Sequence, residues 1–260
     1  IEEGNTTTSA NVLFDILRKI PTGTEINFTL KGENKLSLKS RNSDFNLLCL
    51  PASNFPTFDD KFETEKIEIE KKRFLSLLNK TKISISNDDT RHYLNGIYLH
   101  ATESNKNTFL TGVATDSHRL SSSSIAVDNM KSFTSIIIPR KTVFQLCSLL
   151  DNVDEKLFIQ TSSNKIKFSL GKINLISKVI DGKFPDYQKV VPKENTKTLT
   201  VSSKDFINSV ERVASVSIDR KEGVKLELSQ DKLKLSVNST NSGDGNEVVA
   251  AKYDGEDLAI

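Results

Sequence analysis

The sequence predicts an α+β protein built from repeated half-units, in each of which one helix packs on an antiparallel sheet. Two observations predict this arrangement: amphipathic helical stripes recur about 130 positions apart, and segments of alternating apolar and polar residues follow them. Of the 260 residues, 27% are charged, 36% are hydrophobic and 6 are proline. This composition is typical of a folded soluble protein and not of a disordered tail.

The first helix is expected to begin after Ser9, a suitable N-cap residue, and to end at Ile20. A second helix is expected at 139–150, where Pro139 stands in the first turn, in which proline is tolerated. Each has apolar residues at positions i, i+3, i+4 and i+7, the spacing of a helix with one buried face. The two stripes are Leu13, Ile16, Leu17 and Ile20, and Val143, Leu146, Cys147 and Leu150.

Three segments with a period of two follow each helix, which is typical of an antiparallel meander with one solvated face. They span 25–30, 35–39 and 45–50 after the first helix, and 156–161, 165–170 and 173–179 after the second. Both units then end in a Phe-Pro pair, at Pro56 and Pro185, which are 129 positions apart. One inserted or deleted residue accounts for the drift.

The remaining parts of the chain also match each other, at a separation of 132 positions. A strand at 66–70 leads into a helix at 71–82, and a strand at 198–202 leads into a further helix. A strand that starts with glycine, at Gly96 and at Gly223, follows each helix. The expected buried faces are Phe74, Leu77, Leu78 and Thr81, and Phe206, Ser209, Val210 and Val213.

Two kinds of half-unit are therefore expected to alternate: B, a helix followed by three strands, and A, a strand–helix–strand unit. Their order is B, A, B, A over 1–64, 65–130, 131–196 and 197–260. Since a repeat of A followed by B would be incomplete at both ends, we expect the natural chain to be longer at both ends.

The charge and cysteine content exclude several classes of protein. With 36 Lys and Arg against 34 Asp and Glu, the net charge is +2, which excludes a histone-like polycation but allows a local basic surface. No stretch reaches the ~18 apolar residues of a membrane span, and no signal peptide is visible. Cys49 and Cys147 lie far apart without C-x-x-C spacing, so we expect reduced thiols in a cytoplasmic protein.

Residue types of a catalytic triad are adjacent in 114–120, at Asp116, Ser117 and His118. Adjacent residues in a strand or tight turn point apart, whereas the residues of a triad converge from distant segments. The chain also lacks a nucleophile elbow, a P-loop and a dinucleotide fingerprint. We interpret the segment as a turn in which Arg119 pairs locally, and keep a hydrolase that uses Ser117 and His118 as a weaker alternative.

No metal or cofactor is expected, because His92 and His100 lack the Cys or carboxylate spacing that would complete a metal site. His100 is interpreted as a surface residue at the end of a strand. The helix 71–82 carries five basic residues and no acid, and Arg140 and Lys141 stand in the first turn of the helix at 139–150. Such helices offer a phosphate-facing surface in one interpretation and an ordinary solvated face in the other.

Four separate segments carry a signature that spans essentially the whole chain in order. They are Arg91-His-Tyr-Leu-Asn-Gly96, Val113-Ala-Thr-Asp-Ser-His-Arg-Leu120, Ile138-Pro-Arg-Lys141 and Val179-Ile-Asp-Gly-Lys-Phe-Pro-Asp-Tyr187. Together they resemble the bacterial sliding clamps, the beta subunit family of DNA polymerase III. The resemblance implies three like domains per subunit, of which this chain holds the second half of the first (1–64), all of the second (65–196) and the first half of the third (197–260).

The resemblance also implies a function without catalysis. Two subunits would join head to tail into a homodimeric ring that encircles duplex DNA without reading its sequence and tethers the replicative polymerase. The implied partners are duplex DNA, the DNA polymerase III catalytic subunit, the clamp loader, and other replication and repair proteins with clamp-binding motifs. The main alternative is a repeat scaffold that binds proteins without enclosing DNA.

Carried over by position, the resemblance implies three sets of site residues. A pocket for partner peptides between domains two and three would contain Leu94, Thr115, Ser117, His118, Arg119, Leu120, Pro185, Lys189 and Val190. The DNA-contact residues would be Arg91, His92, Tyr93, Arg140 and Lys141. The subunit interface would contain Phe45 and Leu47 on one side, and Ser215 and Val216 on the other.

Some of these positions depart from the family pattern. His92 stands where a phenol is usual, Ser117 where glycine is common, and Lys189 where arginine is frequent. Lysine and arginine are not equivalent hydrogen-bond donors. Ser215 and Val216 are smaller than the aliphatic pair often found at the interface.

Overall fold

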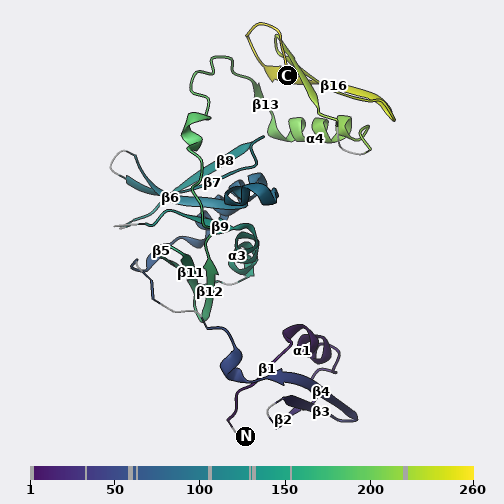
Figure 1. Ribbon diagram of the computed structural model, residues 1–260. Helices are drawn as coiled ribbons and strands as arrows, with labels where there is room; N and C mark the ends of the chain where they lie inside the picture. The colour runs from purple at the N-terminus through teal and green to yellow at the C-terminus, as the bar shows by residue number, and fades with distance from the viewer. Residues whose placement is uncertain are drawn as a thin grey trace. The chain divides into compact units, whose positions relative to one another are not determined.

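A computed structural model describes residues 3–32, 34–57, 61–62, 64–104, 107–128, 130, 133–152, 154–218 and 222–260 (Figure 1). The chain divides into two compact units, Ile1–Phe184 and Pro185–Ile260, and each is described by itself. Both units place helices on antiparallel sheets, so the predicted α+β class is confirmed.

The first part of unit 1 is a four-stranded antiparallel sheet in the order β1-β4-β3-β2, with helix α1 packed on it. Leu36, Leu38 and Cys49 form the buried core, and Leu13 and Ile16 of the helix pack against them. The elements are β1 (Thr7–Thr8), α1 (Ala10–Leu17), β2 (Asn27–Lys31), β3 (Lys35–Ser40), β4 (Ser43–Leu50) and the 3-10 helix η1 (Ala52–Asn54).

Helix α1 is shorter and less buried than the sequence predicts. It ends at Leu17, and the predicted end at Ile20 is wrong because Pro21 disfavours helical backbone in the residue before it. Ser9 occupies the N-cap position with an extended backbone, but its side chain makes no capping hydrogen bond. No residue of α1 is fully buried, so its apolar stripe is only partly covered by the described residues.

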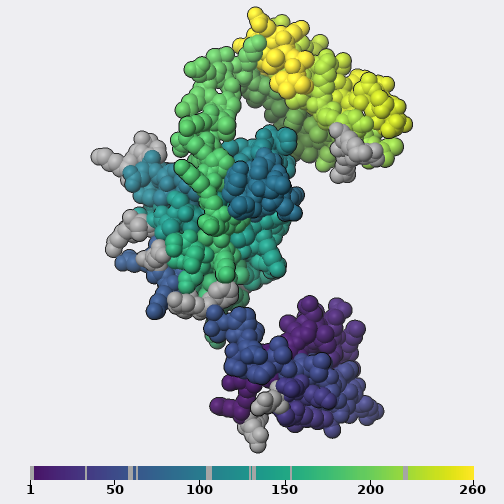
Figure 2. Space-filling model, in the orientation of Figure 1, coloured from purple at the N-terminus to yellow at the C-terminus, as the bar shows by residue number. Residues whose placement is uncertain are grey.

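Two further sheets form the rest of unit 1, in the orders β12-β11-β10-β5 and β8-β7-β6-β9 (Figure 1). Each sheet takes one strand from the other half of the sequence, because β5 pairs with β10 and β9 pairs with β6. This exchange joins 65–130 and 131–184 into one closely packed body within unit 1 (Figure 2). The strands are β5 (Ile67–Ile69), β6 (Gly96–Ser104), β7 (Asn107–Thr115), β8 (Leu120–Ala126), β9 (Ile136–Pro139), β10 (Leu157–Thr161), β11 (Lys165–Leu170) and β12 (Ile173–Lys178).

Helices α2 (Lys71–Thr81) and α3 (Arg140–Asn152) pack on each other and on these sheets around one core. Both predicted helix faces are confirmed as buried. They consist of Phe74, Leu77, Leu78 and Thr81, and of Val143, Leu146, Cys147 and Leu150. Two short 3-10 helices, η2 (Lys82–Ser84) and η3 (Asp89–Leu94), connect α2 to β6 and carry several of the predicted site residues.

Unit 2 is a five-stranded sheet in the order β13-β16-β15-β14-β17, with α4 packed on it. The Ser202 side chain caps this helix by accepting a hydrogen bond from the N–H of Asp205 at 3.4 Å. Ser209 and Val213 on its predicted face are buried. The elements are η4 (Tyr187–Lys189), β13 (Thr200–Val201), α4 (Ser203–Ala214), β14 (Lys225–Ser229), β15 (Lys232–Ser239), β16 (Gly243–Lys252) and β17 (Leu258–Ala259).

His100 is buried, with 8% of its surface exposed, so its interpretation as a surface residue is wrong. Its ring stacks on Tyr98, with centroids 4.6 Å apart and planes inclined by 20°. Burial lowers the pKa of His100 below its ordinary value. The alternation pattern assigned this residue to a solvated face, but the aromatic stack covers that face.

Cys49 and Cys147 are free thiols, and both are buried. In the part of the chain that the structure describes, no helix is long and apolar enough to cross a membrane. The same residues contain no group of three or more His, Cys, Asp or Glu side chains that could hold a metal ion.

Candidate functional site

The turn between β7 and β8 contains five of the nine residues predicted for the partner pocket, from Thr115 to Leu120. Thr115 closes the turn with its hydroxyl, which donates to the carbonyl of Arg119 at 2.8 Å and accepts from the N–H of Ser117 at 3.1 Å. The backbone N–H of Asp116 also donates a hydrogen bond to the Arg119 carbonyl, at 3.4 Å. The turn is therefore held by its own polar groups.

Asp116 makes a second set of hydrogen bonds that hold this turn. Its carboxylate accepts hydrogen bonds from the backbone N–H groups of His118 and Arg119 and from Arg119 Nε, each at 3.0 Å. The bond from the Arg119 backbone, followed by the others, holds the pKa of Asp116 below its ordinary value. The local pairing of Arg119 is confirmed, and the carboxylate orients the turn and not the imidazole of His118.

Ser117 adopts a left-handed backbone, with φ of +76°. Residues with a Cβ atom are strained in this region, whereas glycine adopts it freely. The hydroxyl of Ser117 accepts a hydrogen bond of 2.5 Å from Nη1 of Arg91, 26 positions earlier in the chain. Hence the side chain of Ser117 faces a residue predicted to contact DNA.

Asp88 holds the other side of the Arg91 guanidinium. Arg91 Nε donates to Asp88 Oδ2 at 2.8 Å, and Asp88 Oδ1 accepts from the backbone N–H and the hydroxyl of Thr90 at 2.9 and 2.6 Å. The hydroxyl of Thr90, then its N–H and Arg91, lower the pKa of Asp88 to about 2. Sequence reasoning missed Asp88, although an Asp two residues before a threonine is a recognisable Asx turn.

His92 and Tyr93 lie on η3 against the segment that follows β12. His92 Nε2 lies 3.1 Å from the carbonyl oxygen of Asp181, so this nitrogen carries the proton and donates. Gly182 has φ of +143°, and a Cβ atom there would lie 3.1 Å from the Cβ of Tyr93. Glycine at this position therefore permits the close approach of the two segments.

Three of the five predicted DNA-contact residues line one hollow of about 530 Å³ at the start of α3. They are His92, Arg140 and Lys141, and the guanidinium of Arg140 lies over the ring of Phe144 at 4.9 Å from its centroid. Arg91 and Tyr93 are not among its lining residues. The remaining lining residues are Ser86, Asn87, Asp89, Asn95, Pro139 and Ile180.

The other predicted pocket residues have different exposures. Leu94 is 2% exposed and forms part of the buried interior of unit 1. Lys189 and Val190 belong to unit 2, where Lys189 Nζ pairs with Asp186 at 3.2 Å and Val190 is 69% exposed. Pro185 is the first residue of that unit.

Phe45 and Leu47, predicted for the subunit interface, lie on one face of β4 and are partly buried against the core of the first sheet. Their neighbour Leu48 points to the other face and is 79% exposed. Phe45 also lines a mostly apolar hollow of about 550 Å³ between the end of α1 and the β3–β4 turn. In the described part of this sheet, β4 pairs with β1 at two residues, and the rest of that edge has no partner strand.

Ser215 and Val216, on the other predicted side of the interface, directly follow α4. The carbonyl of Val216 accepts a hydrogen bond of 2.5 Å from the hydroxyl of Ser242, and the hydroxyl of Ser215 donates to the Arg212 carbonyl at 2.6 Å. The neighbouring strand β16 pairs with β13 at two residues, so most of that edge also lacks a partner among the described strands.

Glu247 of β16 binds the guanidinium of Arg212 through both oxygens, with bonds of 2.8 Å from Nε and 2.5 Å from Nη2. Its Oε1 also accepts from Ser209 at 2.8 Å. Arg212, then Ser209, lower the pKa of Glu247 to about 2. Because the pair is 35 residues apart, no local sequence pattern could indicate it.

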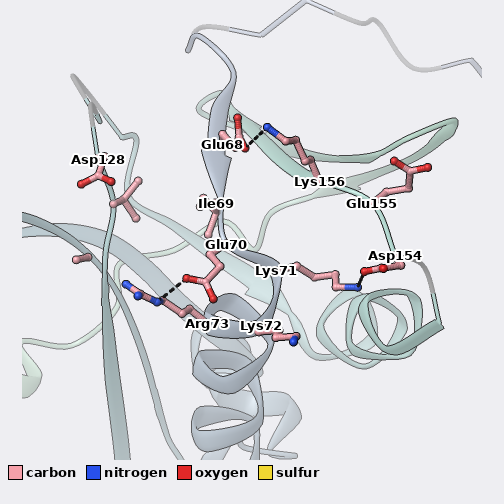
Figure 3. A pocket seen from close by; sticks show the side chains of 12 residues that line it. Glu68, Ile69, Glu70, Lys71, Lys72, Arg73, Asp128, Asp154, Glu155 and Lys156 are labelled. Atoms are coloured by element: carbon pink, nitrogen blue, oxygen red, sulfur yellow. Dashed lines mark hydrogen bonds and ion pairs between the residues drawn. The ribbon is translucent and has the colours of Figure 1, made fainter.

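A larger hollow, of about 900 Å³, lies where α2 begins (Figure 3). Six of its charged side chains form three ion pairs and turn toward their partners. The pairs are Glu68 with Lys156 at 2.8 Å, Glu70 with Arg73 at 2.6 Å and Lys71 with Asp154 at 2.9 Å. We interpret this charge network as a structural feature, since mutually paired carboxylates and amines leave little net charge for a ligand.

Comparison with known proteins identifies the family of the chain. Sequence models of the DNA polymerase III beta subunit match the chain over 1–59 (N-terminal domain), 68–186 (central domain) and 188–260 (C-terminal domain). The chain belongs to the DNA polymerase III beta subunit family. The predicted function is thereby confirmed: the chain is a non-catalytic processivity clamp that binds DNA and polymerase partners, and both the hydrolase and the scaffold alternatives are rejected.

Individual relatives agree with this assignment. The chain is 36% identical to the beta sliding clamp of Caulobacter vibrioides (strain NA1000 / CB15N), over 99% of the chain and 70% of the relative. Identity to the Escherichia coli K12 clamp is also 36%, over 100% and 69%. A crystal structure of the C. crescentus clamp superposes with a TM-score of 0.95 at 35% identity, over 99% and 69%. The sliding clamp of Bartonella birtlesii, bound to griselimycin, gives 0.91 at 39%, over 98% and 68%.

Proposed function

We propose that the clamp function of this chain is divided among three surfaces: a partner-docking surface, a DNA-contact surface and a subunit interface. The chain would consist of half a domain (1–64), a whole domain (65–196) and another half (197–260). The exchange of β5 and β9 supports one domain over 65–196, because each sheet there needs a strand from the other half-unit. We further propose a cytoplasmic location, where thiols such as Cys49 and Cys147 stay reduced.

The DNA-contact surface is proposed to contain Arg91, His92, Tyr93, Arg140 and Lys141. The observation that carries this proposal is that His92, Arg140 and Lys141 line one hollow, although they lie almost fifty positions apart in the sequence. Cationic side chains grouped on one surface bind phosphates without reading bases, which is what sliding requires.

The test of this surface is duplex binding as a function of salt. Arg140→Ala and Lys141→Ala should each weaken binding of a short duplex and reduce the slope of log affinity against log salt by about 1. Lys172→Ala, at an exposed turn between β11 and β12, is the matched control and should change neither value. An unchanged slope in both hollow variants would remove these residues from the DNA-contact surface.

The topological part of the function is tested with the complete subunit. A clamp loader places it on nicked circular DNA, the circle is then cut, and the bound fraction is followed. A ring is retained on the circle and lost from the linear form. Equal retention on both forms would mean ordinary electrostatic binding and would contradict the ring mechanism.

The partner-docking surface is proposed to centre on the β7–β8 turn. The locks made by Thr115 and Asp116 hold Ser117, His118 and Arg119 exposed beside the partly buried Leu120. A fixed turn that presents polar groups beside an apolar anchor suits a short linear motif, because little conformational entropy is lost on binding. Leu94 from unit 1 and Pro185, Lys189 and Val190 from unit 2 are proposed as further members from the resemblance alone.

Docking is tested with a labelled peptide that carries the clamp-binding motif of the DNA polymerase III catalytic subunit. Arg119→Ala and Leu120→Ala should lower its affinity at least several-fold, and His118→Ala should also lower it. Lys172→Ala again serves as the control. Unchanged affinity in both the Arg119 and the Leu120 variants would contradict this assignment. The clamp loader and the repair partners are proposed to use the same surface.

The subunit interface is proposed to join Phe45 and Leu47 of one subunit to Ser215 and Val216 of the next. Both regions adjoin strand edges, β4 and β16, that have unpaired backbone groups over most of their described length. Such edges are stabilised by pairing with another chain. In sedimentation equilibrium of the complete subunit, Leu47→Ala should weaken the dimer more than Leu48→Ala, whose side chain lies on the opposite face of β4.

A further inference from the structure

The guanidinium of Arg91 is held at two points that belong to different parts of the proposed function. Asp88 fixes Nε at 2.8 Å from within the same loop, and Ser117 accepts from Nη1 at 2.5 Å from the β7–β8 turn. The second bond joins the proposed DNA segment 91–93 directly to the proposed partner turn 115–120. The Arg91 side chain is 39% exposed, so a ligand can reach it.

We infer that Ser117 is a positioning residue that couples DNA contact at 91–93 to partner docking at 115–120 through its hydrogen bond with Arg91. The inference rests on the proposed assignment of these two segments. It assigns a role to a hydroxyl group at a position where the family commonly has glycine, which cannot form this bond.

The backbone of Ser117 supports the inference. At φ of +76° a serine is strained and a glycine is not, so the backbone alone favours glycine. The turn does not need the serine side chain for closure, because Thr115 and Asp116 supply the closing hydrogen bonds. The one partner that the structure gives to the Ser117 hydroxyl is Arg91, and a hydrogen bond from a cation is stronger than a neutral one.

The sign of the coupling follows from the hydrogen bond between Arg91 and Ser117, which each ligand must break. A DNA phosphate that takes Nη1 of Arg91 releases the hydroxyl of Ser117, which then becomes available to a partner peptide. A peptide that takes this hydroxyl releases Arg91 for a phosphate. The same bond is broken once in either order, so the first ligand assists the second, and the effect is equal in both directions.

The test measures the affinity of the labelled polymerase peptide with and without a saturating 20-base-pair duplex. Loss of one such charge-assisted hydrogen bond corresponds to a change of about tenfold or more, so the wild-type protein should bind the peptide that much more tightly when the duplex is present. In Ser117→Ala and Ser117→Gly the ratio of the two affinities should fall to about one. Lys172→Ala should keep the wild-type ratio.

The pair of Ser117 variants separates coupling from backbone strain. Ser117→Gly removes both the strain and the bond, and it should be at least as stable as the wild type, whereas Ser117→Ala keeps the strain. In an Arg91→Ala background neither Ser117 change should alter the ratio further. A coupling ratio retained in Ser117→Gly, or a wild-type ratio of one, would overturn the inference. If the wild type fails to bind either probe alone, the proposed function itself is wrong.

Discussion

The ring of Phe184 stacks on that of Tyr98, with centroids 4.9 Å apart and planes inclined by only 7°. Tyr98 in turn stacks on His100, so three rings form a column over strand β6. Phe184 is the last residue of unit 1 and is 6% exposed. The column therefore fixes the end of unit 1 to its own sheet, next to the loop that carries His92 and Tyr93.

Removing the outer ring of this column should destabilise unit 1. Phe184→Ala is expected to lower the free energy of unfolding by about 3–5 kcal/mol, because it removes a buried aromatic side chain and its stacking contact with Tyr98. Urea unfolding followed by circular dichroism measures the change. Phe55 stands at the matching position of the repeat but is 64% exposed, so Phe55→Ala should cost no more than about 0.5 kcal/mol. Similar losses in both variants would contradict a structural role for the column.

His100 should make stability depend on pH. Burial lowers its pKa from 6.5 in the folded protein, so the unfolded chain binds the proton first as the pH falls. The contribution of the neutral imidazole to the free energy of unfolding is fully present above pH 6.5. It is lost as the pH falls from there through the folded-state pKa. The urea midpoint of the wild type should therefore drop between pH 7.5 and 5.5 by more than that of His100→Gln. Parallel pH profiles would assign the dependence to other groups.

Glu247 and Arg212 should act at lower pH. The folded-state pKa of Glu247 is about 2 against an ordinary value of 4.5, so its stabilising contribution is present above pH 4.5 and is lost as the pH falls toward 2. Glu247→Gln should lower the urea midpoint at pH 6, and the difference from the wild type should narrow below pH 4.5. Glu256 forms an exposed ion pair with Lys197, with Nζ and Oε2 3.7 Å apart. Glu256→Gln should therefore leave the urea midpoint unchanged at both pH values.

Gly182 should be needed for the DNA-contact segment. Gly182→Ala adds a Cβ atom 3.1 Å from that of Tyr93 on a backbone with φ of +143°, so it should destabilise the protein by more than about 1 kcal/mol and weaken duplex binding. Gly23→Ala is the matched control, because Gly23 also has a positive φ but has no neighbour within 4 Å of an added Cβ. It should be destabilised by backbone strain alone, with duplex affinity unchanged. Equal duplex affinity in the two variants would argue against a role in DNA binding for the close approach of Gly182 and Tyr93.

The sequence predicts periodicity well and pairing poorly. The stripes of α2 and α3 are buried as expected, because a 3.6-residue period identifies one face of a helix whatever covers it. A period of two identifies the faces of a strand but not its neighbours, so the exchange of β5 and β9 could not be predicted. His100 shows the same limit, because its ring stacks on Tyr98 and Tyr98 in turn stacks on Phe184, which lies 84 positions after His100.

The candidate site divides in the same way. The local lock of Asp116 on Arg119 follows from a spacing of three residues, and the sequence supports it. The bond between Arg91 and Ser117 spans 26 positions, and that between Arg212 and Glu247 spans 35. Such bonds depend on the path of the strands between them. The resemblance supplied the members of each surface, but it could not supply the hydrogen bonds that connect them.

The uncovered edges of β4 and β16 have a consequence for assembly beyond the ring. When two different surfaces of identical chains bind each other, every added subunit leaves one surface free for the next. The assembly stops growing only if the rotation between neighbouring subunits closes it into a ring. A dimeric ring is therefore a polymer that stops at two members. In the proposed interface, closure would also cover both strand edges, which otherwise are templates for aggregation. A substitution that changes the angle between subunits and leaves the edge pairing intact would convert closed rings into open filaments.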